Sequence, residues 1–175
     1  MKSVMLSFNN LIFTALIEKF EQLESEGKVF LHKNVSNNNN KIRFNTPYSF
    51  KLFPKLEEQR KSLWKTDFMF CYEIDVEQLC LYAVVKCDLT KSEHEKCKKI
   101  FMLIDKKFHK KSFEENWDYW SNLSTGTRKI EMNFNEMSDE EFYAKKDDII
   151  DPIFVKLMEN IKEFEDKLKK GGFDL

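Results

Sequence analysis

Glycine and proline are scarce in this 175-residue sequence, which contains four and three of them respectively. The scarcity of glycine argues against a glycine-rich phosphate loop, and the low content of both residues argues against a disordered chain. No apolar run approaches the roughly 20 residues that a membrane-spanning helix needs. The 29 basic and 30 acidic residues nearly cancel, so the whole chain has no bias toward nucleic acid or acidic substrates. We expect a single domain, residues 1–175, that does not bind membranes.

Cysteine is also sparse, and its spacing contains no Cys-x-x-Cys motif. The first residues lack the pattern of a secretory signal, so we expect a cytoplasmic protein whose cysteines are free and mostly buried thiols. His94 and Cys97 could share a helix face, but two ligands do not make a tetrahedral metal site. No thiol or histidine lies in a recognisable nucleophile motif. We therefore predict no metal, no cofactor and no catalytic residue. The four cysteines are Cys71, Cys80, Cys87 and Cys97.

The most apolar stretch, residues 67–86, predicts two strands joined by a tight turn. Apolar side chains occupy every second position from Phe68 to Ile74, and the alternation resumes from Leu79 to Val85. Alternation with a period of two places one set of side chains on one face of a sheet. Because both faces of this hairpin are largely apolar, we expect it at the centre of a sheet that is covered on more than one side.

Three segments have apolar residues at helical spacing, and we expect main helices near 8–26, 92–109 and 151–170. Alternation elsewhere predicts further strands. Together these patterns predict an α+β fold, in which three main helices pack against a mostly antiparallel sheet with the 67–86 hairpin at its centre. The further strands are expected at 29–33, 41–44, 48–53 and 128–134.

Short motifs predict where helices begin. Ser92 with Glu95, and Ser138 with Glu141, have the form of a capping box. Pro152 is expected at the first position of the last helix, where its missing N–H costs nothing.

A metal-dependent nuclease needs clustered carboxylates and usually a lysine. The hairpin carries Glu73 and Asp75 on its first strand and Lys86 on its second. Val84 occupies the position where a Glu/Asp-x-Lys arrangement requires an acid, so the arrangement is missing. These charges are also typical of the polar end of a sheet, and we expect no hydrolase activity.

Local charge is more informative than the total. Residues 41–65 contain seven basic and two acidic residues, and residues 86–111 contain nine basic and four acidic residues. Residues 131–151 contain eight acidic and two basic residues. This segregation predicts one basic and one acidic surface. The alternative is a set of solvated helix faces whose charges pair within the molecule.

A basic surface with nearby aromatic residues suits contacts with phosphate groups and stacking on bases. We expect nucleic-acid or effector binding in two groups of residues. The first group is Lys51, Lys55, Arg60, Lys61 and Lys65, and the second is Lys98, Lys99, Lys106 and Lys107.

The order of these features matches a known pattern. An Ile-Arg-Phe strand leads into a Thr-Pro-aromatic segment, and a strand pair, a lysine-rich helix, a tryptophan segment, a strand and a closing helix follow. The sequence resembles the C-terminal, non-catalytic region of bacterial proteins of the PD-(D/E)XK nuclease superfamily, over about residues 8–170. The residues that carry the resemblance are KIRFNTPYSFKLFPKL (41–56), Trp64, FMFCYEID, LCLYAVVKCDLT, EHEKCKKIFMLIDK and WDYWSNLSTGTRKI.

The family's nuclease domain is not part of this sequence, so the resemblance carries over no catalytic residue. It implies an accessory or partner-binding module from a restriction or mobile-element context. We therefore expect a non-catalytic binding protein in a nucleic-acid-targeting system. It would be an accessory module of a defence nuclease, or a phage-type inhibitor, similar to an anti-CRISPR protein, that binds the effector or its RNA. The alternatives are a degenerate metal-dependent nuclease and a structural or self-assembling protein. The partner is then a protein effector or nuclease, a nucleic acid, or both, and the oligomeric state stays open.

Overall fold

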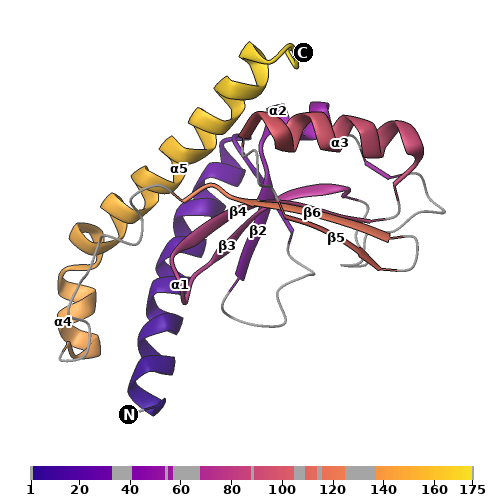
Figure 1. The fold of residues 1–175 in the computed structure, drawn as a ribbon. Helices are drawn as coiled ribbons and strands as arrows, with labels where there is room; N and C mark the ends of the chain where they lie inside the picture. The colour runs from indigo at the N-terminus through magenta and orange to yellow at the C-terminus, as the bar shows by residue number, and fades with distance from the viewer. Residues whose placement is uncertain are drawn as a thin grey trace.

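A computed structural model describes residues 2–32, 41–53, 55–56, 68–87, 89–104, 109–113, 116–124 and 137–174. These residues form an α+β fold, as the sequence predicts. The elements in chain order are α1 (Lys2–Ser25), β1 (Phe30–Leu31), β2 (Lys41–Asn45), α2 (Pro47–Leu52), β3 (Phe70–Asp75), β4 (Cys80–Cys87), α3 (Lys91–Ile104), β5 (His109–Phe113), β6 (Asn116–Asn122), α4 (Asp139–Ala144) and α5 (Lys146–Lys170) (Figure 1).

The described strands form one six-stranded sheet in the order β1-β2-β3-β4-β6-β5. Every neighbouring pair is antiparallel. The hairpin of β3 and β4 pairs from Phe70 opposite Val85 to Asp75 opposite Cys80, and it fills the third and fourth places of the sheet. The central position predicted for this hairpin is therefore confirmed.

Aromatic contacts identify the face of the sheet that the helices cover. Phe164 of α5 stacks on Phe70 of β3, with 6.4 Å between ring centroids, and Phe101 of α3 packs on Tyr119 of β6 at 5.5 Å. Phe70 and Tyr119 both lie opposite Val85 of β4 in the strand register, so they share one face. Helices α3 and α5 therefore lie on the same side of the sheet.

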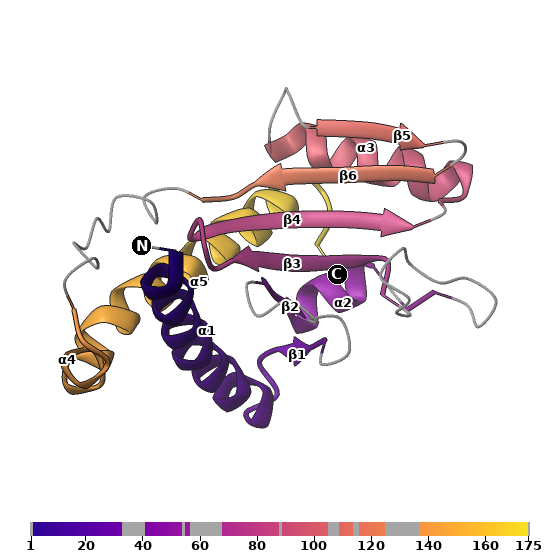
Figure 2. The ribbon, with the colours of Figure 1, turned by 90° about the horizontal axis from the view of Figure 1, so that it is seen from below.

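Helix α1 lies on this side too, because Phe20 packs on Phe44 of β2 at 4.5 Å and Phe44 pairs with Tyr72 on the covered face. Figure 2 shows the strands in front, with α3 behind β5 and β6. The described helices therefore lie on one side of the sheet. Side chains on the second face are buried as well, since Cys71 is fully buried and Glu73 is 8% exposed.

The alternation of residues 48–53 predicts a strand, but residues 48–52 belong to helix α2 and Phe53 is its C-cap. The physical reason is a capping box just before them. The Thr46 side chain accepts a hydrogen bond from the Ser49 N–H, and the Ser49 hydroxyl accepts one from the Thr46 N–H. Pro47 takes the first helical position, where its fixed φ suits the helix. Thr46 itself is extended, as expected for a residue before proline.

Helix α3 differs from its prediction at both ends. Thr90 and Glu93 make the capping interaction, rather than Ser92 and Glu95, because the Thr90 N–H donates to the Glu93 carboxylate at 2.8 Å and the Glu93 N–H donates to Thr90 Oγ1 at 3.3 Å. The helix ends at Ile104 rather than near residue 109, where strand β5 begins. Both sequence motifs fit the same S/T-x-x-E form, so the pattern alone did not separate them.

The remaining predictions have mixed outcomes. Ser138 and Glu141 form the predicted capping box of α4. Helix α5 begins at Lys146, so Pro152 lies inside the helix and not at its first position. Strands β1 and β2 occur where the sequence predicts them. The strand predicted at 128–134 lies outside the described residues.

Three cysteines are free and buried, as predicted, and burial raises the pKa of the Cys71 thiol. The side chain of the fourth, Cys87, lies outside the described set.

Candidate functional site

The predicted basic residues lie on two helices and the segment between α2 and β3. Lys51 is in the last turn of α2, Lys55 follows that helix, and Lys98 and Lys99 are on α3; all four are exposed. The other predicted binding residues lie outside the described part of the chain. These are Arg60, Lys61, Lys65, Lys106 and Lys107.

Lys96 joins the two predicted groups. Its Nζ donates a hydrogen bond to the Leu52 carbonyl oxygen at the end of α2, and the same Nζ lies 5.4 Å from the centre of the Phe53 ring. Burial lowers the pKa of Lys96. This contact holds α3 against the end of α2, so lysines about 45 residues apart in the sequence occupy neighbouring helices.

The C-terminal end of α5 contributes a third group. The Tyr48 hydroxyl of α2 donates to the Phe173 carbonyl oxygen at 2.8 Å, and Lys169 Nζ lies 5.0 Å from the Tyr48 ring centre. Leu103 of α3 lies so close to Gly171 that a Cβ added at that glycine would collide with it. Helices α2, α3 and α5 therefore meet at one place (Figure 1).

We call this meeting point of three helices the basic junction. The local charge of the sequence does not predict its α5 lysines, because they lie outside the two continuous basic stretches. The available signal was the cluster of basic residues in the last turn of the final helix, which also suits the helix dipole. The exposed lysines of the basic junction are Lys51, Lys55, Lys98, Lys99, Lys167, Lys169 and Lys170.

Glu165 of α5 carries a half-buried carboxyl group that connects this helix to the start of α2. It accepts hydrogen bonds from Thr46 Oγ1 at 2.5 Å and from the Tyr72 hydroxyl at 2.9 Å. Burial raises the pKa of Glu165, and this outweighs the lowering by the two hydrogen bonds. Burial also raises the pKa of Tyr48 to about 12, so its hydroxyl stays a hydrogen-bond donor at neutral pH. These contacts fix the N-terminus of α2 to α5.

Helix α4 and the first turn of α5 carry acidic residues. They lie at the opposite end of α5 from α2 and α3 (Figure 1). We call this region the acidic tip. Lys19 of α1 pairs there with Asp151 at 2.8 Å and with Asp147 at 3.6 Å, and Lys146 pairs with Glu18. Part of the negative charge is therefore compensated within the molecule. The acidic tip consists of Asp139, Glu140, Glu141, Asp147, Asp148 and Asp151, which are all exposed.

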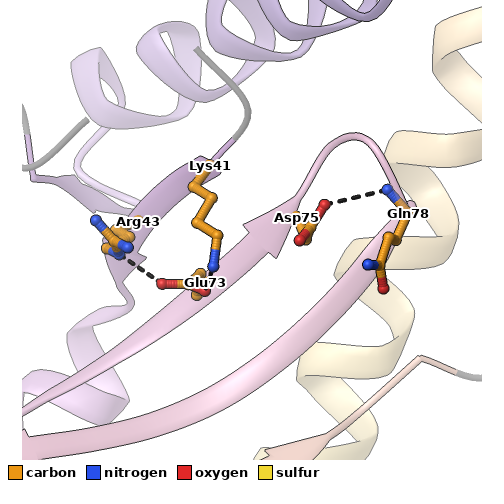
Figure 3. A network of polar contacts seen from close by, with 5 residues as sticks. All are labelled: Lys41, Arg43, Glu73, Asp75 and Gln78. Atoms are coloured by element: carbon orange, nitrogen blue, oxygen red, sulfur yellow. Dashed lines mark hydrogen bonds and ion pairs between the residues drawn. The ribbon is translucent and has the colours of Figure 1, made fainter. Parts of the chain in front are cut away.

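Glu73, a carboxylate in the candidate nuclease set, is bound by two cations on the second face of the sheet (Figure 3). Lys41 Nζ lies 2.7 Å from its Oε1, and Arg43 Nε lies 2.6 Å from its Oε2. Burial raises the pKa of Glu73, but Lys41 and Arg43 together leave it below the ordinary value. Asp75 instead accepts a hydrogen bond from the Gln78 N–H in the hairpin turn.

The nuclease arrangement does not assemble among these residues. Glu73 pairs with Tyr82 in the strand register, so Lys86 of β4 lies four residues further along, about 13 Å away. Within the described residues, no group of three or more His, Cys, Asp or Glu side chains lies close enough to hold a metal ion.

His94 and Cys97, the other candidate pair, are on one face of α3. The His94 Nδ1 lies 2.5 Å from the Tyr119 hydroxyl, and the pKa of Tyr119 is raised to about 12, chiefly by burial. Cys97 is fully buried. His94 and Cys97 of α3 and Tyr119 of β6 are therefore part of the packing between this helix and this strand.

Comparison with known proteins gives no family model, curated protein or solved structure that matches this chain. Among the helices that the structure describes, none has the length and apolar character to span a membrane.

Proposed function

We propose that this chain is a non-catalytic binding protein of a nucleic-acid-targeting system, and that it binds nucleic acid through the basic junction. The observation that carries the proposal is the meeting of α2, α3 and α5, each of which carries exposed lysines. Lysine ammonium groups arranged in this way attract phosphate groups and release the counterions that surround nucleic acid.

The alternative of internally paired charges fits the basic junction poorly. Within the described residues, Lys98, Lys99 and Lys167 make no ion pair. The ion pair of Lys169 with Asp166 is long, at 3.9 Å. The acidic tip, in contrast, is partly neutralised by α1. The exposed positive charge of Lys98, Lys99 and Lys167, which lack an ion pair among the described residues, supports an external polyanion as the partner.

Fluorescence anisotropy with labelled single-stranded RNA and duplex DNA tests the proposal. The variant with Lys98→Glu and Lys99→Glu should bind at least about tenfold more weakly at low salt, because two phosphate contacts become repulsive. The matched control carries Lys145→Glu and Lys156→Glu, which change the net charge equally but lie outside the junction. Equal weakening by both variants, or no binding by the wild type, would contradict the proposal.

The place of the protein in a defence or anti-defence system rests on the resemblance to the non-catalytic region of PD-(D/E)XK proteins. That resemblance supports an accessory module of a nuclease, or an inhibitor of such a machine encoded by a phage or mobile element. The neighbouring genes are the direct check. A nuclease or CRISPR operon beside the coding sequence is expected, and unrelated metabolic neighbours would argue against this context.

A protein effector is the second candidate for the same surface. Met102 and Leu103 are large, exposed apolar residues on α3 beside the lysines. Phosphate groups make no favourable contact with such side chains, whereas the buried centre of a protein interface is rich in apolar residues. If an effector is the partner, Met102→Ser should weaken effector binding and leave nucleic-acid binding unchanged.

The degenerate nuclease is tested by incubation with DNA and RNA in the presence of magnesium or manganese. No cleavage is expected. Cleavage that disappears in Glu73→Ala would establish hydrolase chemistry instead.

A further inference from the structure

Large exposed apolar side chains occur at both ends of the molecule. On α3, Met102 is 54% exposed and Leu103 is 44% exposed. At the other end, Tyr143 of α4 is 60% exposed. Val155, which is 53% exposed, is the tenth of the 25 residues of α5 and lies nearer the middle of that helix. Single exposed apolar residues are ordinary, but exposed apolar side chains that border groups of exposed charges of one sign are typical of interaction surfaces.

The apolar residues on α3 are surrounded by positive charge. Met102 follows Lys98 by four residues, and Leu103 follows Lys99 by four, so each apolar side chain shares a helix face with a lysine. Leu103 also lies against Gly171, next to Lys170 at the end of α5. Exposed apolar and cationic side chains therefore lie side by side on α3, next to the end of α5.

The acidic tip has the converse arrangement. Tyr143 follows Asp139 by four residues and Glu140 by three on α4. An exposed aromatic side chain at the acidic tip is thus bordered by carboxylates.

The two ends cannot meet within one molecule. Helix α5 contains 25 residues, so at 1.5 Å per residue its acidic and basic ends are about 37 Å apart. Figure 1 shows α4 at one end of this helix and α2 with α3 at the other. Any contact between the ends must join two copies of the chain.

We propose that the basic junction of one molecule binds the acidic tip of a second copy, head to tail. Both charge and apolar character are complementary, because lysines face carboxylates and Met102 with Leu103 face Tyr143. The contact joins different surfaces, so it leaves a free junction on one molecule and a free tip on the other and extends into chains. Only a patch of each surface takes part, which is typical of weak, concentration-dependent association.

This self-association goes beyond nucleic-acid binding and does not depend on it. It uses the same lysines, however, so a nucleic acid that occupies the junction should dissociate the chains. The junction would then exchange one anionic partner, the tip of a second copy, for another, the phosphate backbone.

Sedimentation velocity of the full chain at increasing concentration tests the proposal. The wild type should form dimers and longer species at low salt and return to monomers at high salt, because screening weakens the contact between charged surfaces. A junction variant with Lys99→Gln and Leu103→Gln should be monomeric. A tip variant with Glu140→Gln and Tyr143→Gln should also be monomeric. All four positions are exposed, so circular dichroism and thermal unfolding should show an unchanged fold.

Mixing the two variants gives the decisive result. The junction variant keeps an intact tip, and the tip variant keeps an intact junction. An equimolar mixture should therefore form one-to-one dimers that do not grow further. A mixture that stays monomeric, a variant that still self-associates, or a wild type that is monomeric at high concentration and low salt would overturn the proposal.

The tip variant also separates this inference from the proposed function. It should bind nucleic acid as tightly as the wild type when both are studied at concentrations where the wild type is monomeric. Loss of self-association with intact nucleic-acid binding is the expected outcome for this variant. A failure of nucleic-acid binding in the wild type would leave the mixing result unaffected.

Discussion

Glu73 is a buried carboxylate whose cationic partners come from a strand about 30 residues earlier in the chain. The sequence placed it in a candidate nuclease set because Glu73 and Asp75 lie close together on one strand. Its real partners, Lys41 and Arg43, become visible only when β2 is paired with β3. Local spacing identified the residue as unusual, but its chemistry depends on a strand pairing that spacing does not predict.

Replacement of Glu73 by alanine should lower the free energy of unfolding by about 3 kcal/mol, because the partly buried Arg43 and Lys41 both lose their carboxylate partner. The measurement is denaturant unfolding at neutral pH. Glu77→Ala, at an exposed position in the adjacent turn, is the matched control and should change stability by less than about 0.5 kcal/mol. Equal effects of the two substitutions would contradict the assigned role of the ion pairs.

The pH dependence of this ion-pair network has a defined sign. The pKa of Glu73 is lower in the folded protein than in the unfolded chain, so the ion pairs stabilise the fold above the ordinary pKa of 4.5. That stabilisation should disappear as the pH falls through the lower, folded-state pKa. Denaturant unfolding across this acidic range should show that the wild type is more stable than Glu73→Gln, and that the difference in unfolding free energy decreases as the pH falls. A difference that increases as the pH falls would contradict this assignment.

Glu165 should behave in the opposite way, because burial raises its pKa in the folded protein. The stabilisation that protonated Glu165 gives to the fold is fully present below the ordinary pKa of 4.5. It is lost as the pH rises through the higher, folded-state pKa. Glu165→Gln keeps an oxygen that can accept from Thr46 and Tyr72, and it carries no charge to desolvate. The stability of this variant relative to the wild type should therefore increase with rising pH. A constant difference at all pH values would show that Glu165 does not titrate with folding.

At the scale of the elements, the clearest test concerns the start of α3. Thr90→Ala should lower the free energy of unfolding by about 1 kcal/mol, because it removes the side-chain oxygen that accepts from the Glu93 N–H. Ser92→Ala lies in the first turn at an exposed position and should have little effect. Thermal unfolding of the two variants compares them directly. A larger loss in Ser92→Ala would restore the capping box expected from the sequence.

The sequence predicted elements well where the signal is local and continuous. The hairpin of β3 and β4 has strict alternation on both strands, and α5 has a long apolar stripe, so both were recognised. Residues 48–53 also alternate, but Thr46, Pro47 and Ser49 make a helix start that overrides the alternation. The end of α3 was missed because the basic residues after Ile104 fit a helix end and an edge strand equally well.

At the scale of the whole molecule, segregation of charge along the chain becomes segregation in space. The acidic tip follows from one continuous segment, so the sequence predicted it almost completely. The basic junction combines three segments, and Lys167, Lys169 and Lys170 joined it only through the packing of α5 against α2 and α3. Composition predicts that such a surface exists, whereas tertiary contacts decide which lysines belong to it.

The salt dependence of nucleic-acid binding tests most directly whether the three helices act as one surface. Affinity for duplex DNA is measured by anisotropy over a range of salt concentrations, for the wild type and for Lys51→Gln, Lys99→Gln and Lys167→Gln. Each substitution should reduce the slope of log affinity against log salt by about 1, because each lysine neutralises one phosphate. The triple variant should lose about 3 units of slope if the contacts are independent. A slope that changes for a lysine of only one helix, or for none of them, would contradict the basic junction as the binding surface.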